Sequence, residues 1–266
     1  MTPGEVRELL TRYGIRPSKA LGQNFLTDAN TAQRIVRLAD IEPGDRVVEV
    51  GPGVGSLTVA LADAGARVTA IELDRHLIPI LDEVLAGRAV DVRNDDALKV
   101  DWAATLDGEP WQMVANLPYN VATPVVITAL ESAPMITRFL VMVQREVGER
   151  LAAGVGDDGY GAPSLKVAYY ATAKVVGTVS PNVFLPKPNV DSALVRLERH
   201  AQAPVAVRDA NAMFELVRAG FATRRKTLRN TLEGRVDADR FARAGIDPRA
   251  RAETLTLDDW ARLADA

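Results

Sequence analysis

The sequence predicts an α/β protein with a doubly wound, mostly parallel sheet and a small all-helical domain at its C-terminal end. Between about residues 30 and 200, short apolar segments typical of strands alternate with segments of helical periodicity. A glycine-rich turn at 51–55 joins one of these strands to a helix, as in nucleotide-binding βα units. Beyond residue 204 the pattern is helical throughout. We therefore expect a Rossmann-like domain at 1–203 and a helical domain at 204–266.

The individual elements follow from hydrophobic periodicity and from the turn residues between them. Strands are expected at 46–50, 67–73, 89–93, 112–115, 138–143, 175–178 and 193–197, and helices around 31–39, 57–64, 75–86, 124–131, 145–153 and 211–232. No clear helix separates the last two strands, which predicts an antiparallel edge of the sheet.

The composition is that of an ordinary globular protein, with 47% hydrophobic and 25% charged residues in 266 positions. The chain has no cysteine, which excludes disulfides, thiolate nucleophiles and cysteine-ligated zinc. Its two histidines, His76 and His200, argue against a histidine metal cluster or a serine–histidine triad. Because no run of 18 apolar residues occurs and the N-terminus lacks a signal-peptide core, we expect a cytoplasmic protein without membrane attachment.

The net charge of −3 is unevenly distributed. Residues 200–266 hold 12 Lys and Arg against 10 Asp and Glu, whereas residues 1–199 hold 20 against 25. Binding to phosphates requires a local basic patch and does not require a basic protein. The chain is therefore compatible with a shaped nucleic-acid target and is poorly suited to general polyanion binding.

The basic residues concentrate in a segment that reads as one amphipathic helix. Its apolar face is formed by Phe214, Val217, Phe221, Leu228 and Leu232. Residues Arg218, Arg225 and Arg229 fall together on another face. We expect this polar face to contact RNA phosphates, with Arg218, Arg224, Arg225, Lys226 and Arg229 as the candidate residues. The alternative is an ordinary solvated charged face.

The glycine-rich turn distinguishes between two classes of cofactor. A dinucleotide fingerprint, G-x-G-x-x-G, requires a third glycine at position 56, where the chain has Ser56. The observed spacing is G-x-G-x-G, and an acid, Glu49, precedes Gly51 by two positions. This pattern is typical of S-adenosylmethionine-dependent methyltransferases, so an NAD-dependent oxidoreductase is the weaker interpretation.

Acidic residues at the ends of the next two strands strengthen this interpretation. Glu72 follows Gly51 by 21 positions, the spacing at which an acid reaches ribose hydroxyls. Asp96, after the third strand, is placed to accept a hydrogen bond from an adenine amine, and Asp95 remains a rival for that role. Three strand ends therefore present residues suited to S-adenosylmethionine.

The segment Asn116-Leu117-Pro118-Tyr119 follows a buried strand and is suited to holding a flipped-out adenine. The Asn116 amide oxygen and the Leu117 carbonyl would accept hydrogen bonds from the exocyclic amine, and Tyr119 would stack on the base. The alternative is a strand-to-helix turn with Asn as a cap and Pro as a breaker.

From about residue 16 to the end, the sequence resembles the KsgA/RsmA-type small-subunit ribosomal RNA adenine dimethyltransferases. The resemblance is carried by LGQNFL at 21–26, VEVGPG at 48–53, NLPYN at 116–120 and FLPKPNVDS at 184–192, with shorter matches at 71–74, 96–98, 144–147, 224–228, 245–248 and 251–253. Several independent motifs in the same order make this resemblance specific.

The resemblance implies a set of functional residues. Cofactor contacts would be made by Asn24, Leu26, Gly51, Glu72, Asp96 and Asn116. Phe184 would be a second aromatic residue near the target base, beside the catalytic Asn116, Leu117 and Tyr119. Without the resemblance, Asn24 would be interpreted as a helix cap, and Leu26 and Phe184 as core residues.

The resemblance also implies a reaction: dimethylation at N6 of two adjacent adenosines in a hairpin loop near the 3′ end of 16S rRNA. The partner would be the assembling 30S subunit, and we expect a monomer that needs S-adenosylmethionine and no metal. A 23S rRNA methyltransferase of the macrolide-resistance type shares this core, but the Leu-Pro-Tyr-Asn sequence at 117–120 and the tail at 245–253 favour the small-subunit type. A non-catalytic assembly or transcription factor on the same fold is a further alternative.

Overall fold

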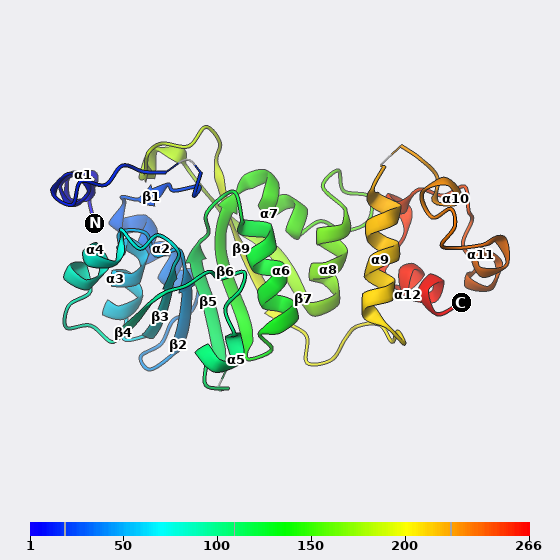
Figure 1. Ribbon diagram of the computed structural model, residues 1–266, viewed down its shortest axis with the longest axis horizontal. Coiled ribbons are helices and arrows are strands. Elements are labelled where there is room, and N and C mark those ends of the chain that lie inside the picture. Colours follow the sequence, from blue (N-terminus) through cyan, green and yellow to red (C-terminus); the bar gives the residue numbers. More distant parts are fainter. Residues whose placement is uncertain (19, 109, 224) are drawn as a thin grey trace. The chain divides into compact units, whose positions relative to one another are not determined.

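The computed structural model describes residues 1–18, 20–108, 110–223 and 225–266, which form two compact units (Figure 1). The first unit comprises Met1–Gly148 and Lys174–Arg199, and the second comprises Glu149–Ala173 and His200–Ala266. The boundary expected at 203/204 lies close to the change of unit after Arg199. The segment Glu149–Ala173 differs from expectation, because it belongs to the second unit and not to the first.

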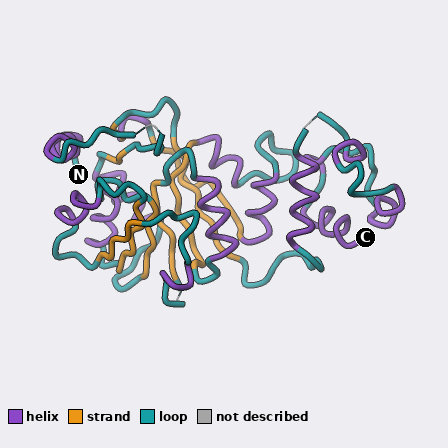
Figure 2. The backbone as a smooth tube through the Cα atoms, viewed as in Figure 1, coloured by secondary structure: helices purple, strands orange, loops and turns teal. Residues whose placement is uncertain are grey.

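A seven-stranded sheet dominates the first unit, with the order β4-β3-β2-β5-β6-β9-β7. Figure 2 shows its strands in orange. Its strands are β2 (Arg46–Val50), β3 (Arg67–Glu72), β4 (Val90–Asn94), β5 (Trp111–Asn116), β6 (Ile136–Gln144), β7 (Ala171–Val179) and β9 (Ser192–Arg199). The pairs from β4 to β6 are parallel, whereas β9 is antiparallel to β6. The doubly wound sheet and its antiparallel edge are therefore confirmed.

The strand order creates a switch point beside β2. The chain winds from β2 to β3 and β4 on one side, then returns to the other side to form β5 and β6. The loops that follow β2 and β5 consequently diverge and leave a crevice at the carboxyl edge of the sheet. Ligands bind at this position in open α/β sheets.

Apolar packing explains why these segments become strands and helices. Val47, Val48 and Val114 are fully buried, as expected for strands covered on both faces. Helices α2 (Ala29–Leu38) and α3 (Ser56–Asp63) place apolar residues such as Ile35 and Leu61 in the same hydrophobic cluster. The remaining helices of the sheet region are α4 (Ile78–Val84), α5 (Trp102–Thr105), α6 (Ala122–Ser132) and α7 (Arg145–Leu151).

Two small elements at the N-terminal end were not anticipated. Helix α1 (Pro3–Arg12) begins with a capping box between Thr2 and Glu5, and it buries Val6 in a hydrophobic cluster with Leu77 and Ile80. Strand β1 (Phe25–Leu26) pairs antiparallel with β8 (Phe184–Leu185). This pairing brings the segments 21–26 and 184–192, which are far apart in the sequence, to the same part of the first unit.

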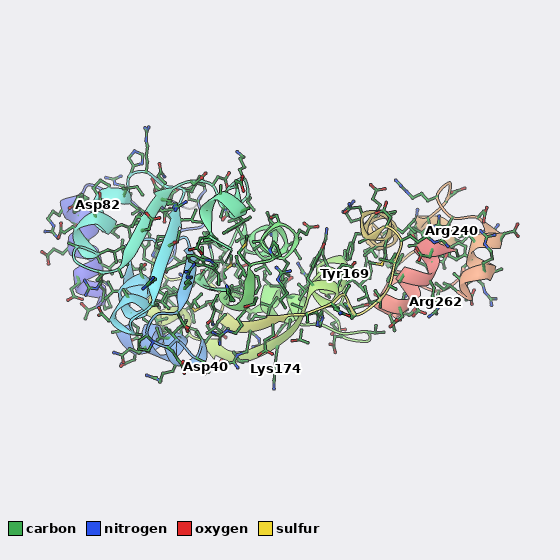
Figure 3. The ribbon with its side chains drawn as sticks, turned by 90° about the horizontal axis from the view of Figure 1, so that it is seen from below. Asp40, Asp82, Tyr169, Lys174, Arg240 and Arg262 are labelled. Atoms are coloured by element: carbon green, nitrogen blue, oxygen red, sulfur yellow. The ribbon has the colours of Figure 1, made fainter. Side chains whose placement is uncertain are left out.

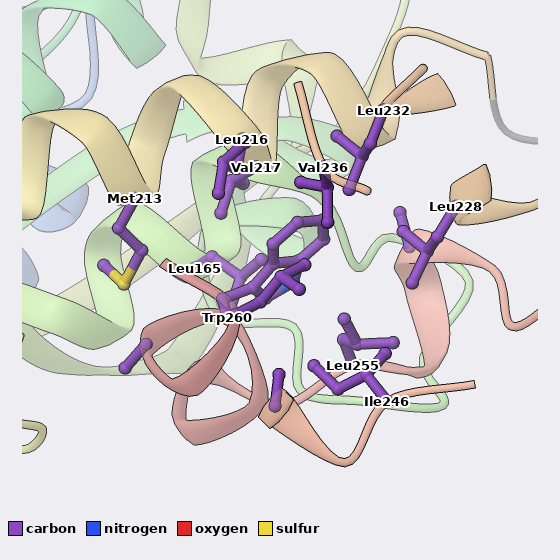
Figure 4. Packing of buried hydrophobic residues seen from close by; sticks show 14 of the residues in the cluster. Leu165, Met213, Leu216, Val217, Leu228, Leu232, Val236, Ile246, Leu255 and Trp260 are labelled. Carbon is purple, nitrogen blue, oxygen red and sulfur yellow. The ribbon is translucent and has the colours of Figure 1, made fainter. Parts of the chain in front are cut away.

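The second unit has its own hydrophobic core of helices (Figure 4). Trp260 and Met213 are fully buried in this core, together with Leu165 from the segment Glu149–Ala173. Its helices are α8 (Ala162–Tyr170), α9 (Ala210–Phe221), α10 (Leu228–Thr231), α11 (Ala238–Ala244) and α12 (Leu257–Asp265). Because α8 contributes to this core, residues 149–173 fold with the C-terminal helices.

The prediction of a single amphipathic helix at 211–232 is wrong. Helix α9 ends at Phe221, and α10 starts only at Leu228. The backbone N–H groups of Leu228 and Arg229 donate to the carbonyls of Ala250 and Pro248, at 2.8 Å each, so they are unavailable to a continuing helix. The apolar residues still reach one core, because a break in the helix allows both halves to pack on it.

Arg240 and Arg262 in the second unit stabilise its fold by donating to carbonyls at helix ends (Figure 3). Arg240 of α11 donates to the carbonyls of Leu263 and Ala264 at the end of α12, and Arg262 of α12 donates to the carbonyl of Ala244 at the end of α11. Each arginine thereby satisfies carbonyls that a helix end leaves without a partner. Of the helices in the described ranges, none is long and apolar enough to cross a membrane.

Candidate active site

A cavity of about 280 Å³ lies in the first unit at the switch point of the sheet. It is lined by the loops that follow β2, β3, β4 and β5, and by the segment at 21–26. The candidate cofactor residues Asn24, Leu26, Gly51, Glu72, Asp96 and Asn116 all line it, as do Leu117 and Tyr119. The structure thus brings together residues that the sequence spreads over almost a hundred positions.

The glycine-rich turn after β2 forms one wall of this cavity. Gly51 and Gly53 have φ values of +71° and +61°, which residues with a side chain rarely adopt. A Cβ on Gly51 would lie 3.1 Å from the Pro118 ring, and one on Gly53 would lie 2.8 Å from Cδ1 of Phe25. Glycine is therefore required by both backbone conformation and space.

Glu72 sits at the end of β3 and organises the neighbouring backbone. Its Oε2 accepts from the Gly53 N–H at 3.1 Å, and its Oε1 accepts from the Asp74 N–H at 2.8 Å. Burial raises the pKa of Glu72 to about 7, although these hydrogen bonds favour the carboxylate. The carboxyl group thus connects the glycine-rich turn to the loop after β3 and borders the cavity.

Glu49, two residues before the turn, is a second buried acid. Its side chain is 1% exposed, and burial raises the pKa of its carboxyl group to about 8. Its Oε2 has no hydrogen-bond partner among the described residues, and neither has the buried Oγ of Ser56, which also lines the cavity. The sequence pointed to Glu49 only as part of the cofactor motif.

The structure distinguishes the two acids after β4. The side chain of Asp96 is 27% exposed, and its Oδ1 accepts from the Leu98 N–H at 3.0 Å. Asp95 is exposed, and its Oδ1 accepts from the Asp96 N–H at 2.7 Å. Both line the cavity, but Asp96 is the more enclosed of the two.

The amide of Asn116 has a defined orientation. Its Nδ2 donates to the carbonyl of Asn24 at 3.1 Å, whereas its buried Oδ1 has no partner among the described residues. The N–H of Leu117 donates to the carbonyl of Met142 at 3.0 Å, which holds this motif on β6. An unpaired buried oxygen is costly, so a donor supplied by a ligand would be stabilised here.

Tyr119 is held by two contacts. Its hydroxyl lies 2.6 Å from Oγ of Ser192, and its ring meets that of Phe184 edge-on, with 6.5 Å between centroids. Burial raises the pKa of Tyr119, so its hydroxyl remains protonated. Phe184 itself is 4% exposed and is not among the described residues that line the cavity, so it contacts the tyrosine ring and does not border the cavity itself.

Asn24 and Leu26 differ in how they contribute. The Asn24 side chain donates to the carbonyl of Gly22 at 3.1 Å, within the turn that precedes β1. Leu26 is 4% exposed and packs in the core that α2 and α3 also enter. The core interpretation of Leu26 is therefore compatible with its position at the cavity wall.

The candidate RNA-binding side chains belong to the second unit. Arg218, Arg225, Lys226 and Arg229 are exposed, and their side chains have no hydrogen bond or ion pair with any residue that the structure describes. They lie on α9, in the turn after it and on α10, because the helix is broken. Arg224 lies outside the described residues.

Two side chains of the site were missed by the sequence analysis. Ser192 is fully buried against the Tyr119 hydroxyl, and Gln23 donates to Oδ2 of Asp74 at 2.9 Å. Both fall inside segments that carry the family resemblance, 184–192 and 21–26. Membership of these segments was the only indication in the sequence that Ser192 and Gln23 belong to the site, because local periodicity does not report contacts between distant segments.

Comparison with known proteins identifies the family. A model of the ribosomal RNA adenine dimethylase family matches residues 15–266. The chain belongs to this family. The ribosomal RNA small subunit methyltransferase A of Leifsonia xyli subsp. xyli is 48% identical over 98% of this chain and 96% of its own length. The protein of that name from Geobacillus kaustophilus is 43% identical over all of this chain and 96% of its own length.

Solved structures support the same rRNA adenine dimethylase fold. The 23S rRNA methyltransferase ErmE is 29% identical, with a TM-score of 0.68, over 91% of this chain and 98% of that chain. A dimethyladenosine transferase from Plasmodium falciparum is 24% identical, with a TM-score of 0.75, over 90% of this chain and 95% of that chain. The predicted family, the Rossmann-like fold and the methyltransferase class are thereby confirmed.

Proposed function

We propose that this enzyme transfers methyl groups from S-adenosylmethionine to N6 of two adjacent adenosines in a hairpin loop near the 3′ end of 16S rRNA. The observation that carries the proposal is the Asn116 amide, whose unpaired oxygen lies in the wall of the cavity beside Tyr119. An adenine amine is a donor of the kind this oxygen lacks. The names of the relatives, small subunit methyltransferases, support the choice of 16S rRNA.

The cavity residues fit S-adenosylmethionine. The glycine-rich turn forms one wall of the cavity, and the positive φ values of Gly51 and Gly53 set the course of the backbone that a ligand there would meet. Glu72 is positioned to receive ribose hydroxyls, and Asp96 to receive an adenine amine. Asn24, Leu26 and Gly51 would line the remainder of the cofactor site. When bound, S-adenosylmethionine supplies a methyl group that is already activated, because its departure leaves a neutral thioether.

The task of the protein is therefore to position the adenine nitrogen. The N6 lone pair of adenine is delocalised into the ring. Hydrogen bonds from N6–H to the Asn116 oxygen and the Leu117 carbonyl favour a more tetrahedral, nucleophilic nitrogen. This is catalysis by orientation and preorganised electrostatics, and it requires neither a metal nor a strong general base. The excess proton can leave to water after transfer.

Aromatic stacking offsets the cost of extruding the base. Stacking is worth about 1–3 kcal/mol per base, and flipping costs a few kcal/mol. Tyr119 would supply the stacking face, with its ring kept in place by Ser192 and Phe184. After the first methyl transfer one N6–H is lost, so one of the two acceptors loses its partner and the pocket must accept a methyl group there.

The second unit would hold the RNA. Its exposed cations Arg218, Arg225, Lys226 and Arg229 are suited to phosphates, and we include Arg224 from its place in the same basic cluster of the sequence. We place the enzyme in the cytoplasm, acting as a monomer on the assembling 30S subunit.

The test is methyl transfer from labelled S-adenosylmethionine into 30S subunits that lack the modification, with 50S subunits in parallel. We expect dimethyladenosine at two adjacent 16S positions, mapped by primer extension. The likeness to ErmE makes 23S rRNA the main alternative substrate. Label in 23S rRNA would establish that alternative. Cofactor binding without label in either subunit would refute the proposed substrate.

A further inference from the structure

We propose that Gln23 is a positioning residue, which keeps the Asn116 amide oxygen turned toward the target base by tying the preceding loop to Asp74. Gln23 lines the same cavity as the proposed catalytic residues Asn116 and Tyr119, but within the described part of the chain its side chain forms no hydrogen bond with either of them. The inference rests on the proposed function, because it concerns how the proposed acceptor oxygen is oriented.

The orientation of an asparagine amide has to be imposed from outside. Its oxygen and nitrogen are nearly equal in size, so sterics alone do not decide which one faces a ligand. In Asn116 the choice is made by Nδ2, which donates to the Asn24 carbonyl at 3.1 Å. If that carbonyl moved away, the amide could turn its NH₂ group toward the base. Two donors would then face each other, and the adenine amine would be repelled.

The position of the Asn24 carbonyl depends in turn on its neighbour Gln23. The side-chain Oε1 of Gln23 accepts from the Ser18 N–H at 2.7 Å, and its Nε2 donates to Oδ2 of Asp74 at 2.9 Å. Both ends of one amide are therefore used to hold the loop. One end closes the loop on itself, and the other fastens it to the loop that follows β3.

Asp74 is a firm anchor because it is held in several directions. Its N–H donates to Glu72 at 2.8 Å, and its Oδ1 accepts from both the backbone N–H and Nδ1 of His76, at 3.1 and 2.9 Å. A continuous path of hydrogen bonds and covalent backbone thus runs from Glu72 through Asp74 and Gln23 to Asn116. It connects the proposed ribose side of the cavity to the base side.

Other contacts hold the same loop but do not replace this one. Nδ2 of Asn120 donates to the Ala20 carbonyl at 2.9 Å, and Gly22 packs so closely on Asn120 that a Cβ would lie 2.5 Å from its Oδ1. These contacts fix the middle of the loop. Phe25, on the other side of Asn24, is paired in β1, so Gln23 is the neighbour whose side chain holds Asn24 from the loop side.

The discriminating variant is Gln23→Glu. The new side chain keeps an oxygen that can accept from the Ser18 N–H. It also places a second carboxylate next to Asp74, so the hydrogen bond is replaced by electrostatic repulsion. The double variant Gln23→Glu/Asp74→Asn restores the hydrogen bond in the opposite direction, with residue 74 as the donor. Gln33→Glu, at an exposed position of α2, makes the same change of charge away from the site.

We expect Gln23→Glu to lower kcat for methyl transfer at least tenfold, with less than about a threefold change in the calorimetric Kd for S-adenosylmethionine. The double variant should recover most of the lost kcat, and Gln33→Glu should match the wild type. A kcat for Gln23→Glu within twofold of wild type, or no recovery in the double variant, would overturn the proposal.

A second measurement does not depend on turnover. In protein labelled with ¹⁵N-asparagine, the side-chain NH₂ signal of Asn116 is assigned by its loss in Asn116→Ala. We expect this signal to shift in Gln23→Glu, with faster hydrogen exchange, and to return in the double variant. An unchanged signal would refute the positioning role. Absence of methyl transfer by the wild type, with this response intact, would refute the proposed function and leave the positioning role standing.

Discussion

The buried carboxyl group of Glu49 makes the stability of the first unit depend on pH, and substitution of this one residue should remove most of that dependence. The ordinary pKa of 4.5 is raised by burial to about 8 in the folded protein. Between these two values the folded protein binds one more proton than the unfolded chain. The free energy of unfolding therefore falls as the pH rises through this window.

The magnitude follows from the two pKa values. A change from 4.5 to about 8 corresponds to roughly 5 kcal/mol of linked free energy over the whole window. Between pH 5.5 and 7.5, a range convenient for experiment, the expected loss is about 2.5 kcal/mol from Glu49. Glu72, whose pKa is raised to about 7, adds a loss of the same sign over the lower part of this range.

Glu49→Gln removes the titrating group and retains the shape of the neutral acid. Urea unfolding should be measured from pH 5.5 to 7.5 by tryptophan fluorescence, since Trp102 and Trp111 lie in the same unit as Glu49. The difference in free energy of unfolding between the variant and the wild type should shift in favour of the variant by about 2.5 kcal/mol from pH 5.5 to pH 7.5. Glu42→Gln, which removes an exposed carboxyl group of the same unit, is the control for the substitution itself.

The reasoning would be refuted if wild type and Glu49→Gln lost stability in parallel with rising pH. That result would mean that Glu49 is ionised in the folded protein, with donors that the structure does not give it.

Four further outcomes are expected. Asn116→Ala should abolish both methyl transfers, measured as mono- and dimethyladenosine by mass spectrometry of digested rRNA; normal turnover would contradict the acceptor role. Tyr119→Phe and Ser192→Ala each remove one member of the same 2.6 Å contact, so their effects on kcat/KM should be equal and not additive in the double variant. Gly53→Ala should cost about 1–2 kcal/mol of unfolding free energy and weaken cofactor binding in calorimetry, because φ is +61° and Phe25 blocks the new Cβ. Arg229→Ala should weaken rRNA binding and lower its salt dependence by about one counterion, with cofactor affinity unchanged.

Much of the first unit could be predicted because its signals are local. The seven expected strands all occur, and Arg46–Val50 agrees to the residue, since a run of buried β-branched residues bounded by turns permits little else. The glycine-rich turn, Glu72 and Asn116 could be placed at one cavity because parallel strands present their carboxyl ends at the same edge. Asn24, Leu26 and Phe184 depended on the family resemblance.

The incorrect predictions depend on contacts between distant segments. Residues 149–173 were assigned to the first unit by chain order, but Leu165 packs in the helical core of the second. The helix expected at 211–232 is broken because the N–H groups of Leu228 and Arg229 find carbonyls some twenty residues further along the chain. Propensity describes a segment by itself and does not include partners of this kind.

By itself, the sequence determined the class of fold, the type of cofactor motif and the residues at the strand ends, because these follow from periodicity and from the geometry of parallel sheets. Only the tertiary structure decided which side chains are satisfied and which are not. The Asn116 nitrogen donates to Asn24, whereas its oxygen has no partner in the described ranges, and the Tyr119 hydroxyl contacts Ser192, 73 positions away. The orientation of each side chain depends on its hydrogen-bond partners, and folding determines which groups come close enough to be partners.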